Sequence, residues 1–186
     1  MLNVINIKMN DLDQKRFPIG KFEYPENICD IKLDEYIKVI RDFPGKLKNL
    51  IENLSDDQLD TQYRDGGWTV RQVVNHLADS HINSFMRFKL TLTEDNPVIK
   101  PYDEAKWAEL QDSASMPIKP AMRMLKGTHQ RWAALLKTMT NKQFERTFHH
   151  PELQKDYDLR SCLAHYVWHC RHHFAHIENL KNEKGW

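Results

Sequence analysis

Apolar residues recur at intervals of three and four along four long segments, and this periodicity constrains the fold of the chain more than any other feature. The segments cover residues 30–53, 69–92, 119–139 and 158–183. Such spacing gives each helix one apolar stripe that must be buried against a neighbour. The chain has only six glycines in 186 residues and few alternating β-type runs. The sequence therefore predicts an all-α protein, a four-helix bundle with short extra helices.

Capping residues indicate where the helices begin. Thr69 and Asp158 stand just before the second and fourth segments, where side-chain oxygens accept hydrogen bonds from the first helical amides. Ser55 and Thr140 predict two short helices in the same way, and another is expected within residues 102–111. Loops are expected at residues 93–101, 112–117 and 149–151.

The first 29 residues have a different character. Pro18, Gly20 and Pro25 interrupt any helix there, so we expect residues 1–29 to form an extended N-terminal segment and residues 30–186 to form the bundle domain. The Pro44-Gly45 pair is expected to kink or split the first long helix.

The overall composition excludes several classes of function. The formal net charge is +1, which gives no field to attract nucleic acid or a membrane surface. No run approaches the roughly 20 apolar residues that span a bilayer. The N-terminus has no secretory apolar region. These observations predict a cytoplasmic protein that binds neither nucleic acid nor membrane.

The last helical segment contains five histidines, and two of them favour a metal site. His169 and His173 lie four residues apart, about one helical turn, so both rings leave the same face. A helical wheel places this pair at the edge of the apolar stripe. His165, His172 and His176 lie further toward the polar side, and we expect His172 and His176 to orient the ligands or to face solvent. Two buried imidazoles on adjacent turns can share one metal ion, or each can be hydrogen-bonded within the core.

The segment 69–92 offers two candidates for a third ligand. His81 lies nearer the middle of its apolar face, and periodicity slightly favours it as the buried residue. His76 lies on the border of that face, in line with Thr69, Ser80, Asn83 and Arg87, as a pocket wall would require. An ordinary solvated helix face explains the same stripe, so the periodicity leaves both histidines open.

Four stretches of the chain resemble the DinB/YfiT-like superfamily, and within it the YfiT group of metal-dependent hydrolases. They read PIGKFEYPE, LDTQYRDGGWTVRQVVNHLADSHINSFMRFKLTLTE, IKPYDEAKWAEL and YVWHCRHHFAHI. The resemblance implies an up-down-down-up four-helix bundle and a homodimer. It also implies one divalent metal ion per chain, bound by His76, His169 and His173.

Three neutral imidazoles with an open position are typical of a catalytic metal site rather than a structural one. Zinc is the expected ion, and nickel is also compatible with imidazole ligands. The expected nucleophile is a metal-bound water, because no side chain stands out as a catalytic acid or base. The candidates for binding substrate or orienting a ligand are Asp79, Ser80, Asn83 and Arg87.

Three functions are compatible with such a site. The first is hydrolysis of a small substrate by the activated water. The second is an S-transferase reaction that joins a low-molecular-weight thiol, such as bacillithiol, to an electrophile, since a metal can also activate a thiolate. The third is a non-enzymatic metal-binding stress protein whose histidines only stabilise the bundle.

Overall fold

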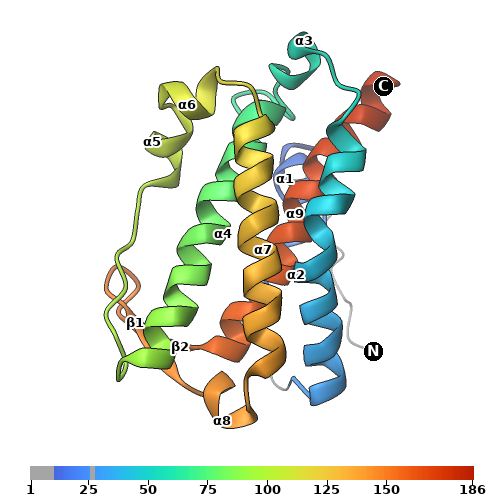
Figure 1. The fold of residues 1–186 in the computed structure, drawn as a ribbon. Helices are drawn as coiled ribbons and strands as arrows, with labels where there is room; N and C mark the ends of the chain where they lie inside the picture. Colours follow the sequence, from blue (N-terminus) through green and yellow to red (C-terminus); the bar gives the residue numbers. More distant parts are fainter. Residues whose placement is uncertain (1–10, 26–27) are drawn as a thin grey trace, which may run out of the picture.

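Four long helices lie side by side in the computed structural model, which describes residues 11–25 and 28–186 (Figure 1). They are α2 (Asp30–Ile51), α4 (Val70–Thr93), α7 (Lys119–Thr138) and α9 (Leu159–Lys184). In Figure 1, α2 runs upward, α4 and α7 run downward, and α9 runs upward again. Both α7 and α9 pack against α2 and α4. The predicted up-down-down-up bundle is confirmed.

Because α4 and α7 run in the same direction, the chain must return to the top of the bundle between them. The returning segment carries α5 (Glu104–Ala108) and α6 (Gln111–Ala114). The helix predicted within residues 102–111 is present as α5, whereas α6 lies where we predicted a loop. Gln72 of α4 donates to the carbonyl of Ala108 at 2.8 Å, which fixes this segment against the bundle.

The capping predictions are confirmed at both long helices. The hydroxyl of Thr69 accepts the amide of Gln72 at 3.1 Å, and the carboxylate of Asp158 accepts the amide of Ser161 at 2.7 Å. Ser55 caps α3 (Asp56–Leu59) and Thr140 caps α8 (Asn141–Phe144) in the same manner. Local hydrogen bonds within three residues decide these helix starts, which explains why the sequence predicts them well.

The prediction for residues 149–151 is wrong. These residues, expected as a loop, belong to an antiparallel hairpin of β1 (Thr147–His150) and β2 (Lys155–Asp158). The loop after α4 supports the hairpin, because the His149 amide donates to the Pro97 carbonyl and the Ile99 amide donates to the His149 carbonyl. Four-residue strands are too short to show an alternating pattern, and the segment that supports β1, at Pro97 and Ile99, lies far away in sequence.

The N-terminal segment also departs from the prediction. Residues 11–16, expected to be extended, form the short helix α1 (Asp11–Arg16), while residues 1–10 and 26–27 lie outside the described part of the chain. Lys15 of α1 forms an ion pair with Glu183 of α9 at 2.8 Å. This contact and a second one described below hold α1 against the last helix, so tertiary contacts support a helix that six residues could not maintain alone.

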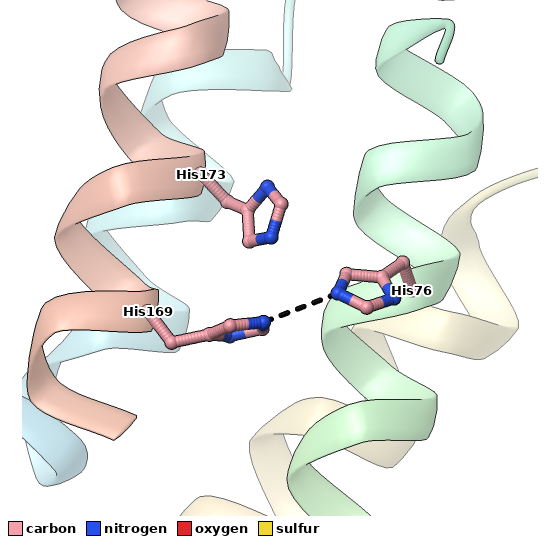
Figure 2. Close-up of side chains that lie close together, drawn as sticks. All are labelled: His76, His169 and His173. Atoms are coloured by element: carbon pink, nitrogen blue, oxygen red, sulfur yellow. Dashed lines mark hydrogen bonds between the residues drawn. The ribbon is translucent and has the colours of Figure 1, made fainter. Parts of the chain in front are cut away.

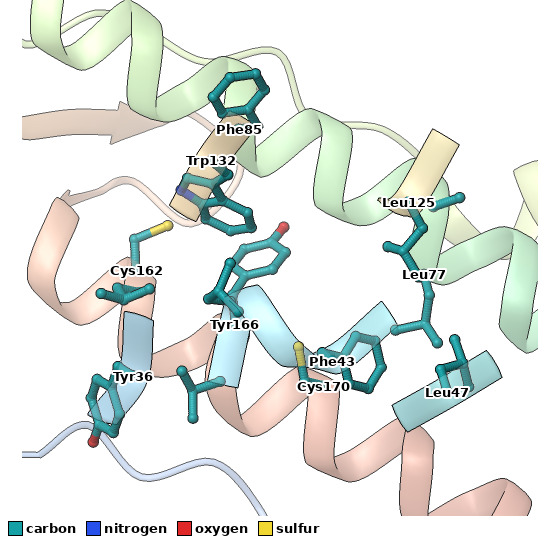
Figure 3. Packing of buried hydrophobic residues seen from close by; sticks show 14 of the residues in the cluster. Tyr36, Phe43, Leu47, Leu77, Phe85, Leu125, Trp132, Cys162, Tyr166 and Cys170 are labelled. Carbon is teal, nitrogen blue, oxygen red and sulfur yellow. The ribbon is translucent and has the colours of Figure 1, made fainter. Parts of the chain in front are cut away.

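We predicted that Pro44 and Gly45 kink or split the first long helix; α2 continues through them as one element, so it is not split. Proline lacks the amide hydrogen that would bond to the carbonyl four residues earlier, which is that of Ile40. The bundle supplies another donor to this carbonyl, as the next subsection describes. Elsewhere the core is apolar and aromatic: Trp132, fully buried, meets the ring of Tyr166 edge-on at 5.5 Å (Figure 3).

A buried arginine connects the top of the bundle. Arg71 of α4 is 4% exposed and reaches the carboxylates of Asp60 at 2.6 Å and Asp56 at 2.9 Å. It also donates to the carbonyl of Met116 at 3.0 Å. One side chain therefore joins α4, α3 and the approach to α7.

We expect Arg71→Met to lower the free energy of unfolding by about 1–3 kcal/mol, because it removes the hydrogen bonds that the buried guanidinium donates to Asp56, Asp60 and the Met116 carbonyl. Urea denaturation measures this difference. Arg41→Met is the matched control, since Arg41 pairs with Asp42 at an exposed surface and should leave the urea midpoint unchanged. Equal midpoints for the two variants would contradict the role of Arg71.

No helix within the described residues is both long enough and apolar enough to span a membrane.

Candidate metal centre

Three buried histidines from two helices converge in the bundle interior. Figure 2 shows His76 of α4 facing His169 and His173 of α9. One ring nitrogen from each residue lies within 4.8 Å of the other two. The Nε2 atoms of His76 and His169 are 3.1 Å apart. The spacing of His169 and His173 on one helical face and the packing of α9 against α4 produce this arrangement together.

The donor set fits a divalent metal ion. Two nitrogens bound to one zinc ion at about 2.0–2.1 Å in a tetrahedral arrangement lie about 3.3–3.4 Å apart. The distance of 3.1 Å between the two Nε2 atoms is close to this value. His76 and His169 are therefore already at the spacing of two ligands to one ion, and a nitrogen of His173 lies within 4.8 Å of both.

The histidines are also in the protonation state that binds metal. Burial lowers the pKa of His76 to about 4. Burial also lowers the pKa values of His169 and His173 well below the usual range, and the neighbouring histidines lower them further. All three rings are therefore neutral near pH 7, and a neutral ring nitrogen keeps the lone pair that a metal ion requires.

A chain of hydrogen bonds fixes the orientation of His169. His129 of α7 donates through Nδ1 to the Ile40 carbonyl that Pro44 leaves without a helical donor. The Nε2 of His129 must then accept, and His81 Nδ1 lies 2.7 Å away as its donor. His81 Nε2 in turn accepts from His169 Nδ1 at 3.0 Å. We call this chain from Ile40 through His129 and His81 to His169 the histidine relay.

The histidine relay has only one consistent placement of protons. A carbonyl oxygen can only accept, and burial lowers the pKa of His129 to about 4 and that of His81 well below its usual range, so both are neutral. Each neutral ring offers one donor and one acceptor. The relay therefore leaves the Nε2 lone pair of His169 directed at His76.

A shorter chain fixes His173. His176 Nε2 donates to the backbone carbonyl of Arg16 in α1 at 3.2 Å. Its Nδ1, 3.3 Å from Nδ1 of His173, must then accept, which leaves Nε2 of His173 with a free lone pair. His172 and His176 are 7% and 3% exposed. The alternative that these two residues face solvent is therefore wrong, because α1 and neighbouring aromatic rings cover them.

His172, His173 and His176 form a second group whose nitrogens lie within 4.8 Å of one another. In this group the Nδ1 atoms of His173 and His176 are already hydrogen-bonded to each other. The ring of His172 stacks on Trp168 at 4.3 Å. In the first group the Nε2 lone pairs of His169 and His173 are free, so this group is the better candidate.

A cavity of about 450 Å³ opens beside the three histidines. The structure places two of the four predicted substrate or orienting residues, Ser80 and Arg87, on its wall. Asp79 and Asn83 are not among the lining residues. The side chain of Asn83 donates to the backbone carbonyl of Asp79, and burial with the nearby Asp112 raises the pKa of the Asp79 carboxyl to about 6. Asp79 is therefore near Asp112 of α6 rather than on the cavity wall.

Sequence reasoning missed the role of His129, and it did not connect Pro44 to the site. A signal existed for His81, since the helical wheel favoured it as the buried histidine of α4, and its side chain is indeed 0% exposed. His81 is buried because it supports His169. The proline at position 44 was a signal too, because a proline inside a helix frees one carbonyl for another donor.

We expect the stability of the metal-free protein to fall as the pH drops from about 6.5 toward 4. The folded pKa values of His76 and His129 are about 4, whereas an unfolded histidine titrates near 6.5, so the unfolded chain binds more protons in this window. Each such histidine removes about 1.4 kcal/mol per pH unit within the window, and the loss is absent above it. Urea unfolding of chelator-treated protein at several pH values measures the slope; a flat profile would contradict burial of neutral rings.

Comparison with known proteins places the chain among relatives with the same architecture. Residues 41–177 match the DinB superfamily. A Bacillus subtilis protein provisionally named metal-dependent hydrolase YfiT is 50% identical over 170 residues, covering 91% of this chain and 96% of the relative. A similarly named protein from Oceanobacillus iheyensis is 46% identical over 172 residues, covering 92% of this chain and 99% of the relative.

Solved structures agree with the fold. The structure of Bacillus subtilis YfiT, described as an unusual four-helix bundle, superposes with a TM-score of 0.91 at 49% identity, covering 93% of this chain and 99% of that one. A mycothiol-dependent maleylpyruvate isomerase shares the fold with a TM-score of 0.57 at 14% identity, covering 80% of this chain and 60% of the isomerase.

Proposed function

Because this chain belongs to the DinB superfamily and is similar to proteins provisionally named metal-dependent hydrolases, we propose that it is a metal-dependent hydrolase of a small substrate. One divalent ion, zinc first and nickel second, is held by His76, His169 and His173. The observation that carries the proposal is the convergence of three buried, neutral imidazoles beside a cavity of about 450 Å³. Closed structural zinc sites use four ligands, whereas three histidines leave a position for a reactant.

A divalent ion in this site supplies a Lewis acid that lowers the pKa of a bound water or thiol. The chain itself supplies orientation. The histidine relay and the His176 contact hold two ligand rings with their lone pairs inward, and the ring of Trp68 lies 4.6 Å from that of His76 and shields it from solvent. Tyr166, which donates to the Ser80 carbonyl at 3.2 Å, forms part of the cavity wall.

A panel of small esters, amides and lactams tests the hydrolase proposal. The protein is purified without a polyhistidine tag, its metal content is measured, and turnover is compared before and after chelation. We expect turnover that disappears with the metal and returns on adding zinc. A protein that retains one metal ion per chain but hydrolyses none of the panel would argue strongly against hydrolysis.

The nature of the cavity wall favours a second candidate, a thiol S-transferase. The two carboxylates that line the cavity, Glu104 and Glu152, are both exposed. Within the described residues, no buried carboxylate lines the cavity to serve as a base for attacking water. A metal-activated thiolate needs no such base. Loss of free thiol from a mixture of bacillithiol and monochlorobimane tests this reaction, and a rate equal to the uncatalysed background eliminates it.

We propose a homodimer in the cytoplasm, and light scattering after size-exclusion chromatography measures the oligomeric state. If the protein were only a metal-binding stress protein, metal removal would lower its melting temperature with no activity to lose. Equal effects of chelation and of His76→Ala on stability, without turnover in either assay, would favour that alternative.

A further inference from the structure

Arg87 lies on the wall of the cavity and has no hydrogen-bonding or ion-pair partner among the residues that the structure describes. It lies on α4 about three turns after His76, or about 16 Å along the helix axis, and its side chain leans back toward the helix N-terminus. The side chain is half-buried. Among the described residues, no carboxylate lies within ion-pair distance of its guanidinium, and no acceptor is hydrogen-bonded to it. A partly desolvated guanidinium with five donors is usually paired with an anion.

The surroundings of Arg87 are suited to receiving an anion. His150 and His165 line the cavity beside it. Burial and the charge of Arg87 lower the pKa of His150, so its neutral ring can donate a hydrogen bond without adding a second cation. The two carboxylates on the cavity wall, Glu104 and Glu152, are exposed, so water and salt screen their repulsion.

From this geometry we infer that the cavity takes an elongated small molecule whose anionic oxygen group, a carboxylate or a phosphate, pairs with Arg87 while its reacting end lies at the three histidines. This inference rests on the proposed metal site and adds a substrate class to it. The guanidinium forms two parallel hydrogen bonds with either group and so sets the distance between the anion and the reacting end. Neutral molecules of the same length lack this contact.

Cobalt-substituted protein and two thiols of equal length provide the test. The thiolate of 6-mercaptohexanoate or of 6-mercaptohexan-1-ol binds the cobalt ion and produces a charge-transfer absorption that reports affinity without turnover. We expect the acid to bind at least about 10-fold more tightly than the alcohol, because a hydrogen-bonded charge pair is lost in the alcohol. Arg87→Gln should remove this preference and leave the affinity for the alcohol unchanged.

Three controls make the result specific. Lys89→Gln removes one positive charge from the exposed side of the same helix and should keep the preference for the acid. Arg87→Lys keeps the charge and should restore part of the preference. Succinate and inorganic phosphate, added as competitors, should displace the acid from the wild-type protein, and the stronger competitor identifies the anionic group.

The outcomes separate this inference from the proposed function. If the protein binds no cobalt, the metal site itself fails. If cobalt and both thiols bind, but the acid has no advantage or Arg87→Gln retains it, the anion-binding role of Arg87 is wrong while the metal site stands. Failure of both competitors to displace the acid would likewise overturn it. Because Arg87 has no polar partner within residues 11–25 and 28–186, we expect Arg87→Gln to melt at the same temperature as the wild type.

Discussion

His76→Ala is expected to reduce metal content from one ion per chain to nearly none. In the proposed metal site His76 is the ligand from α4, so its loss leaves two histidines of one helix, which are too few to enclose an ion. Removing a residue that is hydrogen-bonded to a metal ligand costs about 10–100-fold in metal affinity, so removing a ligand itself should lower the affinity by more than about 100-fold. Titration of tag-free apoprotein with zinc, followed by calorimetry, measures the change, and turnover in either proposed reaction should disappear with it.

His165→Ala is the matched control for that experiment. His165 lies on α9, one turn before His169, and lines the same cavity, but it belongs to neither group of converging nitrogens. We expect this variant to bind zinc as the wild type does. If His76→Ala retained the wild-type affinity, the three-histidine site would be refuted, whatever activity the protein has.

His129→Leu is expected to weaken zinc binding by about 10–100-fold, although His129 is separated from the site by another histidine. The substitution leaves the Ile40 carbonyl and the His81 Nδ1 donor unpaired in the core. Without His129, the His81 ring can carry its proton on Nε2 instead of Nδ1. Nε2 then no longer accepts from His169 Nδ1, so the tautomer of His169 is no longer fixed. Calorimetric titration with zinc measures the affinity, and urea denaturation measures the cost of the two unpaired groups, each about 1–3 kcal/mol.

Two further variants distinguish orientation from general destabilisation. His129→Gln keeps a donor and an acceptor on one side chain, and we expect it to recover part of the zinc affinity. Leu136→Ala creates a cavity in the same helix, where Leu136 is 1% exposed, and should lower stability without changing zinc affinity. If His129→Leu lost stability but bound zinc as tightly as Leu136→Ala, the histidine relay would have only a structural role.

Local patterns determined the elements that the sequence predicted correctly. The four long helices follow from apolar residues at three- and four-residue spacing, and their starts follow from caps such as Thr69 and Asp158. The pairing of His169 with His173 follows from helix geometry alone. Each of these features depends on residues within a few positions of one another, so the sequence contains all the information needed.

Resemblance to the DinB/YfiT-like superfamily was needed for the third member of the group. The helical wheel favoured His81 over His76, and burial supports the wheel, since His81 is 0% exposed and His76 is 8% exposed. Depth on one helix cannot tell whether a buried imidazole faces α7 or α9. His81 contacts both helices, through His129 of α7 and His169 of α9, and its hydrogen bond orients the ring of His169.

The sequence by itself determined a helical bundle with a pair of histidines turned inward. Only the tertiary structure decided which nitrogens converge. The proton positions on His129 and His176 are set by the carbonyls of Ile40 and Arg16, which lie 89 and 160 residues away in sequence. The tertiary structure likewise decided that Arg87 faces the cavity while Asp79 does not. Periodicity fixes the direction of a side chain around its own helix, but what it meets there depends on how the helices pack.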